Sequence, residues 1–223
     1  MIQLLKLFIK TFPNFNLVTF ITAIEANLDD CESVLDVGCG DNSPLRLLNN
    51  RFSLVGVDGY KKAIDSSKKR GIHKKYIYCD VKDLLNKVKQ KSFDAVVALD
   101  LIEHLTKDDG YKFLKDIEKI AKKKLIIVTP NGFIVQLSKS NQLQQHLSGW
   151  TTEDFRKRGF KVKGLYGLKL ILLPFRSDYA ECKFKPKWFW GFIWGLVSEV
   201  THHFFTKNRP ELSFSLLAVK KIN

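Results

Sequence analysis

The sequence predicts an α/β fold in which a seven-stranded, mostly parallel sheet is covered by helices on both faces. First, apolar β-prone runs alternate with helix-like segments five times between residues 33 and 129. Second, three of the runs end in an acid, at Asp58, Asp80 and Asp100. Third, a glycine turn, Gly38-Cys39-Gly40, follows the first run. Such alternation builds a parallel sheet that binds its ligand at the carboxyl ends of the strands.

The first half of the fold is predicted from three short apolar runs. The run that ends at Val37 is almost continuously apolar, as a strand buried on both faces should be. Pro44 is suited to open a short helix, and Gly71 is suited to end a later one. The predicted strands are 33–37, 53–58 and 75–80, and the predicted helices are 44–50, 61–69 and 81–89.

The second half keeps the alternation as far as the turn Pro130-Asn131-Gly132 and is less regular beyond it. One long helix has an apolar face at helical spacing. A later helix starts on a hydroxyl, carries acids in its first turn and bases in its last, and ends at Gly159. The predicted strands are 93–99, 124–129, 160–166 and 212–220, and the predicted helices are 108–122 and 151–159.

Two further segments complete a single predicted domain over residues 1–223. Helix-like spacing over 3–10 and 15–28, broken at Pro13, predicts an N-terminal helical extension within 1–30 that lies over a pocket. Residues 171–208 form an aromatic insertion before the last strand, with lysines ahead of its tryptophans. We expect a helix packed on the sheet edge, a contact between copies, or a peripheral membrane contact through 184–206.

Bulk composition narrows the setting of the protein. The formal charge of +14 favours anionic partners, although a lysine-rich solvated surface explains it equally simply. The four cysteines form no CxxC pair, which argues against a metal-binding or disulfide framework and for a reducing cytoplasm. Neither a signal peptide nor an apolar run of the ~20 residues that span a bilayer is present in the sequence. We therefore expect a cytoplasmic chain, associated with a membrane at most at its periphery.

The glycine turn alone does not choose between nicotinamide, flavin and S-adenosylmethionine (SAM) cofactors. The complete dinucleotide fingerprint has a third glycine where this chain has Ser43. Asp36 stands two residues before the first glycine, where a carboxylate would repel a pyrophosphate. A carboxylate there suits a ligand that carries positive charge, such as a sulfonium.

Four runs then resemble the class I SAM-dependent methyltransferases, and most closely their small type 11 members. In chain order they are VLDVGCGDNSPL, VGVDGYKKAID, YIYCDVKDL and FDAVVALDLIEHL. The later run HLSGWTTEDFRKRGF is similar to a segment that recurs in bacterial and archaeal members. The resemblance covers residues 33–166 and implies a Rossmann-like fold, SAM as the cofactor, and a methyltransferase activity.

The resemblance also implies a role for each matching residue. The glycine turn lines the methionine end of SAM, Asp58 accepts the ribose hydroxyls, and Asp80 bonds the adenine amino group. The alternative for both acids is helix N-capping. Asn42 replaces the family's third glycine and tolerates a left-handed backbone. The implied cofactor-binding residues are Asp36, Gly38, Cys39, Gly40, Asp58, Gly59, Asp80, Val81 and Leu99.

The catalytic candidates are Asp100, Glu103, His104 and, from a distant segment, His146. The first three share one face of a helical turn. The pattern is similar to that of metal-dependent small-RNA 3′-terminal 2′-O-methyltransferases, which use Glu-x-x-Glu-His and a later His, and some quinone-pathway O-methyltransferases resemble it too. Two imidazoles and two carboxylates could hold Mg²⁺ or Mn²⁺. However, Asp100 is shorter than the usual glutamate, and Glu-His pairs also occur here in enzymes without a metal, so we assign no metal.

Three functions follow from these observations. The first is a SAM-dependent methyltransferase that acts on the O or N atom of a small or lipid-linked acceptor. The second, less favoured, is a metal-assisted RNA 2′-O-methyltransferase, for which the basic charge gives some support. The third is a SAM-fold binding protein that has lost catalysis.

Overall fold

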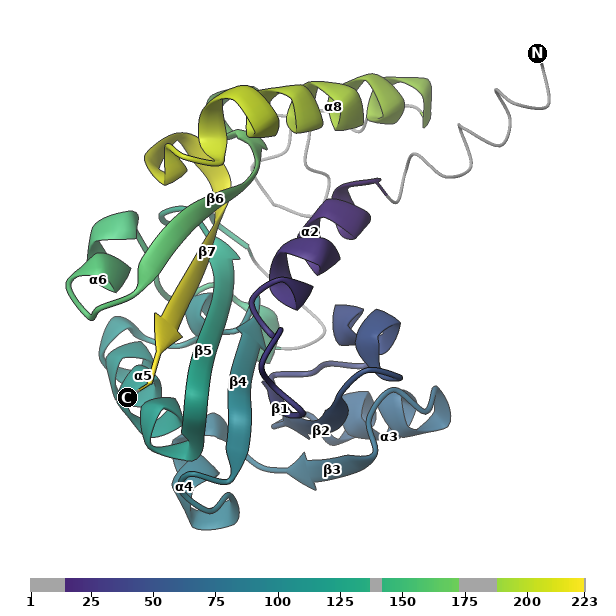
Figure 1. Ribbon diagram of the computed structural model, residues 1–223, viewed down its shortest axis with the longest axis vertical. Coiled ribbons are helices and arrows are strands. Elements are labelled where there is room, and N and C mark those ends of the chain that lie inside the picture. Colours follow the sequence, from purple (N-terminus) through teal and green to yellow (C-terminus); the bar gives the residue numbers. More distant parts are fainter. Residues whose placement is uncertain (1–14, 137–141, 173–187, 223) are drawn as a thin grey trace.

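The computed structural model describes residues 15–136, 142–172 and 188–222. Its seven-stranded sheet has the order β3-β2-β1-β4-β5-β7-β6 (Figure 1). β7 pairs antiparallel with β5 and β6, and the other pairs are parallel, so the predicted mostly parallel sheet is confirmed. The strands are β1 (Ser33–Val37), β2 (Ser53–Asp58), β3 (Lys75–Tyr78), β4 (Phe93–Leu99), β5 (Ala121–Pro130), β6 (Lys161–Leu168) and β7 (Ser213–Lys221).

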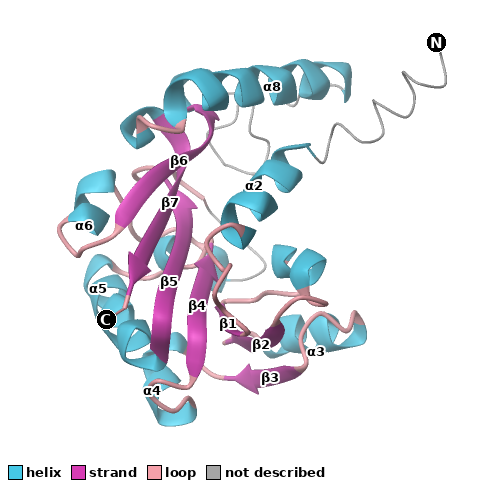
Figure 2. Ribbon diagram, in the orientation of Figure 1, coloured by secondary structure: helices cyan, strands magenta, loops and turns pink. Residues whose placement is uncertain are grey.

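The helical elements fill the predicted connections, although several are shorter than the sequence suggests (Figure 2). The segment after β1 is a 3-10 helix, and the helix expected over 81–89 is a 3-10 turn followed by one α-turn. It ends because Val88 adopts an extended backbone and buries its side chain. The elements are α2 (Phe15–Glu25), η2 (Pro44–Leu48), α3 (Lys61–Lys69), η3 (Val81–Asp83), α4 (Leu84–Lys87), η4 (Ile102–His104), α5 (Lys107–Ile120), η5 (Gln142–Gln144), α6 (Thr152–Arg156), α7 (Lys169–Leu172), α8 (Trp188–Thr201), the π-helical η7 (His202–Thr206) and η8 (Pro210–Leu212).

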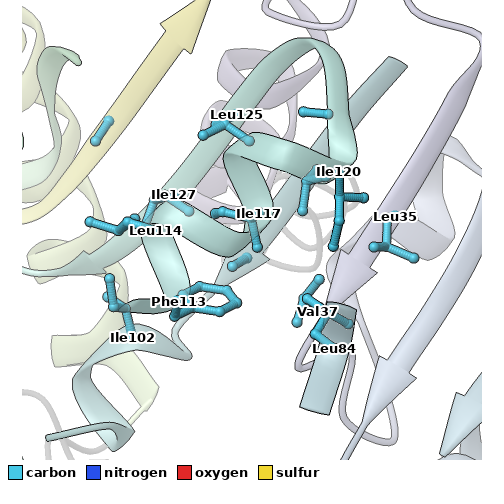
Figure 3. Close-up of a cluster of buried hydrophobic side chains, with 14 of the residues drawn as sticks. Leu35, Val37, Leu84, Ile102, Phe113, Leu114, Ile117, Ile120, Leu125 and Ile127 are labelled. Atoms are coloured by element: carbon cyan, nitrogen blue, oxygen red, sulfur yellow. The ribbon is translucent and has the colours of Figure 1, made fainter. Parts of the chain in front are cut away.

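Two apolar cores sandwich the sheet. On one face, α5 presents Phe113, Ile117 and Ile120 to the strands, and these side chains lie beside Leu35 and Val37 in Figure 3. The opposite core is covered by α2 and η2. Successive strand residues point to opposite faces, so both cores are drawn from the same strands. This burial fixes the strand register and therefore the positions of the strand ends, where the site lies.

The N-terminal extension differs from expectation in its position. α2 buries Phe20 and Ile24 in the second core, and Phe20 stacks on Tyr166 of β6 at 6.2 Å between ring centroids. It covers the sheet because its apolar side chains complete that core, and none of its described residues lines the cavity discussed below. The part of the extension at 3–10 lies outside the described residues.

The aromatic insertion contains one long helix. α8 packs along β6, the edge strand, as one of the sequence alternatives anticipates. Residues 173–187 of the insertion are outside the described part of the chain. Within that described part, no helix combines the length and the apolar character needed to cross a membrane.

Candidate active site

A cavity of about 810 Å³ opens at the carboxyl ends of β1 to β4. Its volume falls in the range typical of small-molecule sites. The residues that line it come from each strand end in turn and from the segment around η5. They are Gly38, Gly40, Asp41, Asp58, Gly59, Tyr60, Lys62, Ala63, Ser66, Asp80, Val81, Lys82, Asp100, Leu101, His104, Leu105, Thr106, Asp109, Leu143, Gln144 and Leu147.

The glycine turn forms one wall because its backbone requires glycine. Gly38 and Gly40 have φ values of 73° and 60°, which side-chain-bearing residues rarely adopt. A Cβ on Gly38 would also lie 2.8 Å from Leu101 Cδ1. The amides of Gly38 and Cys39 donate to the Val57 carbonyl at 2.8 and 3.0 Å, which ties the turn to β2.

Asp36 supports this turn from beneath rather than lining the cavity. Its carboxylate is only 1% exposed and accepts a hydrogen bond from Ser43 Oγ at 2.6 Å. His73 Nε2 lies 2.9 Å from the same oxygen, and this imidazole is fully buried. The sequence assigned Asp36, Cys39 and Leu99 to the cofactor, but all three are buried behind the cavity lining. Sequence spacing gave no sign of His73, which is brought under the turn by the α3–β3 connection.

Asp58 borders the cavity at the end of β2. Its two carboxylate oxygens accept the backbone amides of Gly40 at 2.8 Å and Tyr60 at 2.7 Å. Burial raises the pKa of Asp58, and these two amide donors only partly offset that effect. Tyr60, not Asp58, is the N-cap of α3, so helix N-capping does not account for this acid. A carboxylate fixed in this way can still accept hydrogen bonds from a vicinal diol on its remaining lone pairs.

Asp80 caps a helix and also lies at the cavity. It is the N-cap of η3 and accepts the Lys82 amide at 2.9 Å. It also lines the cavity beside Val81, which supplies an apolar surface suited to the face of a planar base.

The cavity is acidic although the chain as a whole is basic. Five aspartates and two lysines belong to its lining, and one of those lysines, Lys82, pairs with Asp109 at 2.8 Å. The excess of carboxylates favours a ligand with positive charge such as a sulfonium and disfavours a polyanion. Together with the glycine turn and the acid at the end of β2, this donor set fits SAM.

The catalytic candidates meet at the far end of the cavity. Asp100 has a φ of 50° and directs its amide to the Val128 carbonyl at 2.9 Å. The Glu103 carbonyl accepts the amides of Leu147 and Ser148 at 2.8 and 3.1 Å, which holds the later segment against η4. As a result the rings of His104 and His146 lie 4.9 Å apart between centroids. Asp100 and His104 reach the cavity lining, whereas Glu103 and His146 are buried behind it.

Glu103, His104 and His146 each offer one ligand atom, and these atoms lie within 4.8 Å of one another. Oε2 of Glu103 accepts a hydrogen bond from Thr129 Oγ1 at 3.0 Å. Oε1 is buried and has no hydrogen-bond partner among the described residues. Thr129 was not anticipated, because nothing in the β5 sequence marks one hydroxyl as a partner for a distant acid.

The protonation states in this cluster follow from burial. Burial raises the pKa of Glu103 well above its usual value, and the nearby charge of Asp100 raises it further. Hydrogen bonds from the Glu103 backbone and from Thr129 act in the opposite direction. Burial lowers the pKa of His104, and the proximity of His146 lowers it further. Hydrogen bonds to the backbone of Gln145 and Asp100 raise it, but by less than burial lowers it. Burial likewise lowers the pKa of His146. Both imidazoles are therefore neutral near pH 7.

Residues 35–129 match the family model described as a methyltransferase domain, of type 11. This match and the solved structures that share the fold support a class I SAM-dependent methyltransferase domain in this chain. These comparisons support the predicted family and SAM as its cofactor. No sequence among the curated proteins matches the chain.

Solved structures share the fold of this methyltransferase at low sequence identity. A SAM-dependent methyltransferase from Archaeoglobus fulgidus is 16% identical, with a TM-score of 0.59 over 91% of both chains. A possible histamine N-methyltransferase from Thermotoga maritima is 16% identical, with a TM-score of 0.59 over 99% of this chain and 95% of its own. Magnesium protoporphyrin IX methyltransferase from Synechocystis, solved with bound SAM, is 16% identical, with a TM-score of 0.50 over 92% of this chain and 77% of its own. Because these names cover unrelated acceptors, the fold does not select one.

Proposed function

We propose that this methyltransferase transfers the methyl group of SAM to an oxygen or nitrogen atom of a small or lipid-linked acceptor. The observation that carries the proposal is the His104 imidazole, which lines the cavity together with Asp100 and whose pKa is lowered by burial. When bound, SAM supplies an already activated methyl group, so the protein mainly has to position the acceptor and manage one proton.

The cavity residues divide this work between them. Asp58 would hold the ribose, and Asp80 with Val81 would hold the adenine. His104 Nδ1 donates to the Gln145 carbonyl at 3.1 Å, which fixes the neutral tautomer with its proton on Nδ1. In that form His104 can take a proton from an acceptor hydroxyl or ammonium.

The acceptor end of the cavity has an apolar rim. Leu143 and Leu147 both line the cavity and are 56% and 52% exposed. Exposed leucines beside an acidic cavity suit an acceptor with an apolar body, which supports a small apolar or lipid-linked molecule over a nucleic acid.

The test is methyl transfer from labelled SAM to a panel of amines, phenols and lipid-linked acceptors, with wild type and His104→Gln. We expect the variant to lose about 10²- to 10⁴-fold in turnover, the usual contribution of a general base, while SAM binding changes little. Equal turnover in both proteins would reject the role of His104. SAM binding without transfer to any acceptor in the panel would favour the third function, a binding protein.

A second candidate, metal-assisted 2′-O-methylation of RNA, is favoured by the cluster of Glu103, His104 and His146. Glu103 Oε1 has no hydrogen-bond partner in the described part of the chain. Together with two neutral imidazoles it forms a donor set that a divalent ion such as Mn²⁺ takes. Such an ion would be held by these three side chains and would polarise an acceptor diol. The acidic cavity lining weighs against RNA.

Metal dependence separates the two candidates. RNA methylation that Mn²⁺ stimulates and EDTA abolishes would establish the second candidate. Methylation of a small acceptor that is indifferent to both reagents would reject it.

A further inference from the structure

We propose that the outer face of α8 and η7 docks on the surface of an anionic membrane. This face is defined by Leu196, Val200, Phe204 and Phe205. The two elements run along the edge strand β6 at the margin of the molecule in Figure 1, where they appear in yellow and yellow-green. The inference concerns a different surface from the cavity and holds for any acceptor.

The inner face of this helical segment is polar. Ser198 Oγ and Thr201 Oγ1 accept the backbone amides of Gly167 and Leu168, both at 3.2 Å. One turn later, Thr206 Oγ1 donates to the Tyr166 carbonyl at 2.6 Å. These hydroxyls pair with backbone groups of the edge strand, which explains why polar side chains point toward the protein.

The inner face is also tightly packed, so the helix cannot rotate. A Cβ on Gly167 would lie 2.2 Å from Thr201 Oγ1, and a Cβ on Gly164 would lie 2.1 Å from the Thr206 carbonyl oxygen. These contacts fix which face of the segment points outward.

The outer face is apolar. Leu196, Val200 and Phe204 recur every fourth residue and are 45%, 46% and 73% exposed, and the adjacent Phe205 is 49% exposed. Residues four apart lie on the same face of a helix. A helix on the surface of a soluble protein normally turns its apolar stripe inward, so this orientation is inverted. A grouped apolar face of this kind marks an interaction surface.

The charges around the apolar face indicate which partner it binds. The exposed residues that flank the apolar face include His203, Lys207 and Arg209, and the exposed Glu211 is paired with Arg156 at 2.6 Å. A formal charge of +14 opposes association of two copies and attracts anionic lipid. An apolar face bordered by cations is the arrangement by which interfacial helices bind membranes. The surface lies at the carboxyl end of β6, the same end of the parallel sheet at which the cavity opens.

The test is co-sedimentation of the full chain with vesicles of phosphatidylcholine alone or mixed equally with phosphatidylglycerol. We expect binding to the anionic vesicles at least about tenfold tighter than to the neutral ones. The triple variant Leu196→Gln, Val200→Thr, Phe204→Gln should lose about tenfold of that binding. Its control, Leu47→Gln with Tyr78→Gln, changes side chains that are 53% and 60% exposed elsewhere and should bind as wild type.

A charge pair separates docking from general adsorption of a basic protein. Lys207→Gln with Arg209→Gln should weaken binding to anionic vesicles, whereas Lys68→Gln with Lys69→Gln, which removes the same charge from α3, should not. Equal losses in both double variants would overturn the proposal. Unchanged vesicle binding by the triple variant would also overturn it. So would a wild-type protein that binds no vesicles but forms a dimer, if the triple variant is a monomer. Circular dichroism of each variant confirms its fold.

Discussion

Replacing Glu103 with glutamine should stabilise the protein at alkaline pH. The carboxylate is fully buried, and only Oε2 has a hydrogen-bond partner among the described residues. Leaving a buried polar atom unpaired costs about 1–3 kcal/mol, and more when it carries charge. The introduced side-chain amide keeps an acceptor for Thr129 and replaces the charged, unpaired oxygen with a neutral NH2 group. At a pH above the raised pKa of Glu103 we therefore expect a net gain of about 1–3 kcal/mol. For a domain of this size that raises Tm by about 2–12 °C.

The direction of the pKa shift of Glu103 determines how the stability difference between variant and wild type changes with pH. The pKa of Glu103 in the folded protein lies above its value in the unfolded chain, so the folded state binds the extra proton. Wild type is therefore penalised progressively as pH rises from about 4, the unfolded value, through the raised pKa. The difference in Tm between variant and wild type should be small near pH 4 and reach its maximum above the raised pKa.

Thermal melts of both proteins from pH 4 to pH 9 in EDTA measure this difference directly. Glu103→Asp serves as the control that keeps the charge and should show no alkaline gain. A glutamine variant that is less stable than wild type at pH 8, or a pH-independent difference, would refute the reasoning. Repeating the melts with Mn²⁺ tests the metal alternative, because an ion bound by Glu103 would stabilise wild type and not the variant.

Three further predictions concern the framework of the site. A Cβ on Gly110 would lie 2.3 Å from Trp150 Cζ2, so Gly110→Ala should lower stability by about 1–3 kcal/mol in chemical denaturation, whereas Gly195→Ala, with open space around it, should be neutral or stabilising. Burial alone would raise the pKa of Asp154, but hydrogen bonds, chiefly from Lys107 and Thr151, lower it to about 2. Asp154→Ala should therefore lower the free energy of unfolding by about 1–2 kcal/mol at pH 7, after allowing for solvent screening. This difference between variant and wild type should vanish as pH falls from 4 toward 2. His73→Gln removes the imidazole that pairs with the buried Asp36 carboxylate beneath the glycine turn. It should lower the free energy of unfolding by about 3 kcal/mol and weaken SAM binding. Unchanged SAM affinity in calorimetry would show that the glycine turn does not depend on His73.

The strands and their carboxyl ends were predictable because burial leaves a strong local signal. Continuous apolar runs mark parallel strands, and the acids at Asp58, Asp80 and Asp100 follow those runs directly. Since the carboxyl ends of parallel strands meet at one edge, their proximity follows from the topology alone. The glycine turn was equally visible in the sequence, and the left-handed backbones of Gly38 and Gly40 show why glycine is needed there.

The partners of the buried acids were not predictable. The partner of Asp36 is His73, 37 residues away, through a contact made only in the folded state. The same holds for Thr129 in β5 and Glu103 in η4, which meet only in the folded protein. The N-terminal helix was predicted from its periodicity, but its place on the sheet face depends on a three-dimensional core that periodicity does not reveal.

The amphipathic direction of α8 was also beyond the sequence. A run of mixed apolar and small polar residues does not say which side will meet the protein. The edge strand decides this, since Gly167 and Leu168 present backbone amides that the hydroxyls of Ser198 and Thr201 satisfy. Only then does the apolar side become the outer surface.

Calorimetric titration of the protein with SAM tests the central claim most directly, with Asp58→Ala and Asp41→Ala titrated in parallel. We expect wild type to bind one SAM per chain, and Asp58→Ala to bind about 100-fold more weakly, because two hydrogen bonds to a charged acceptor contribute about 3 kcal/mol. Asp41 also lines the cavity but is exposed, and its variant should bind within a few-fold of wild type. Absence of SAM binding by the folded protein, or Asp58→Ala binding as tightly as wild type, would contradict the assignment of this cavity to the cofactor.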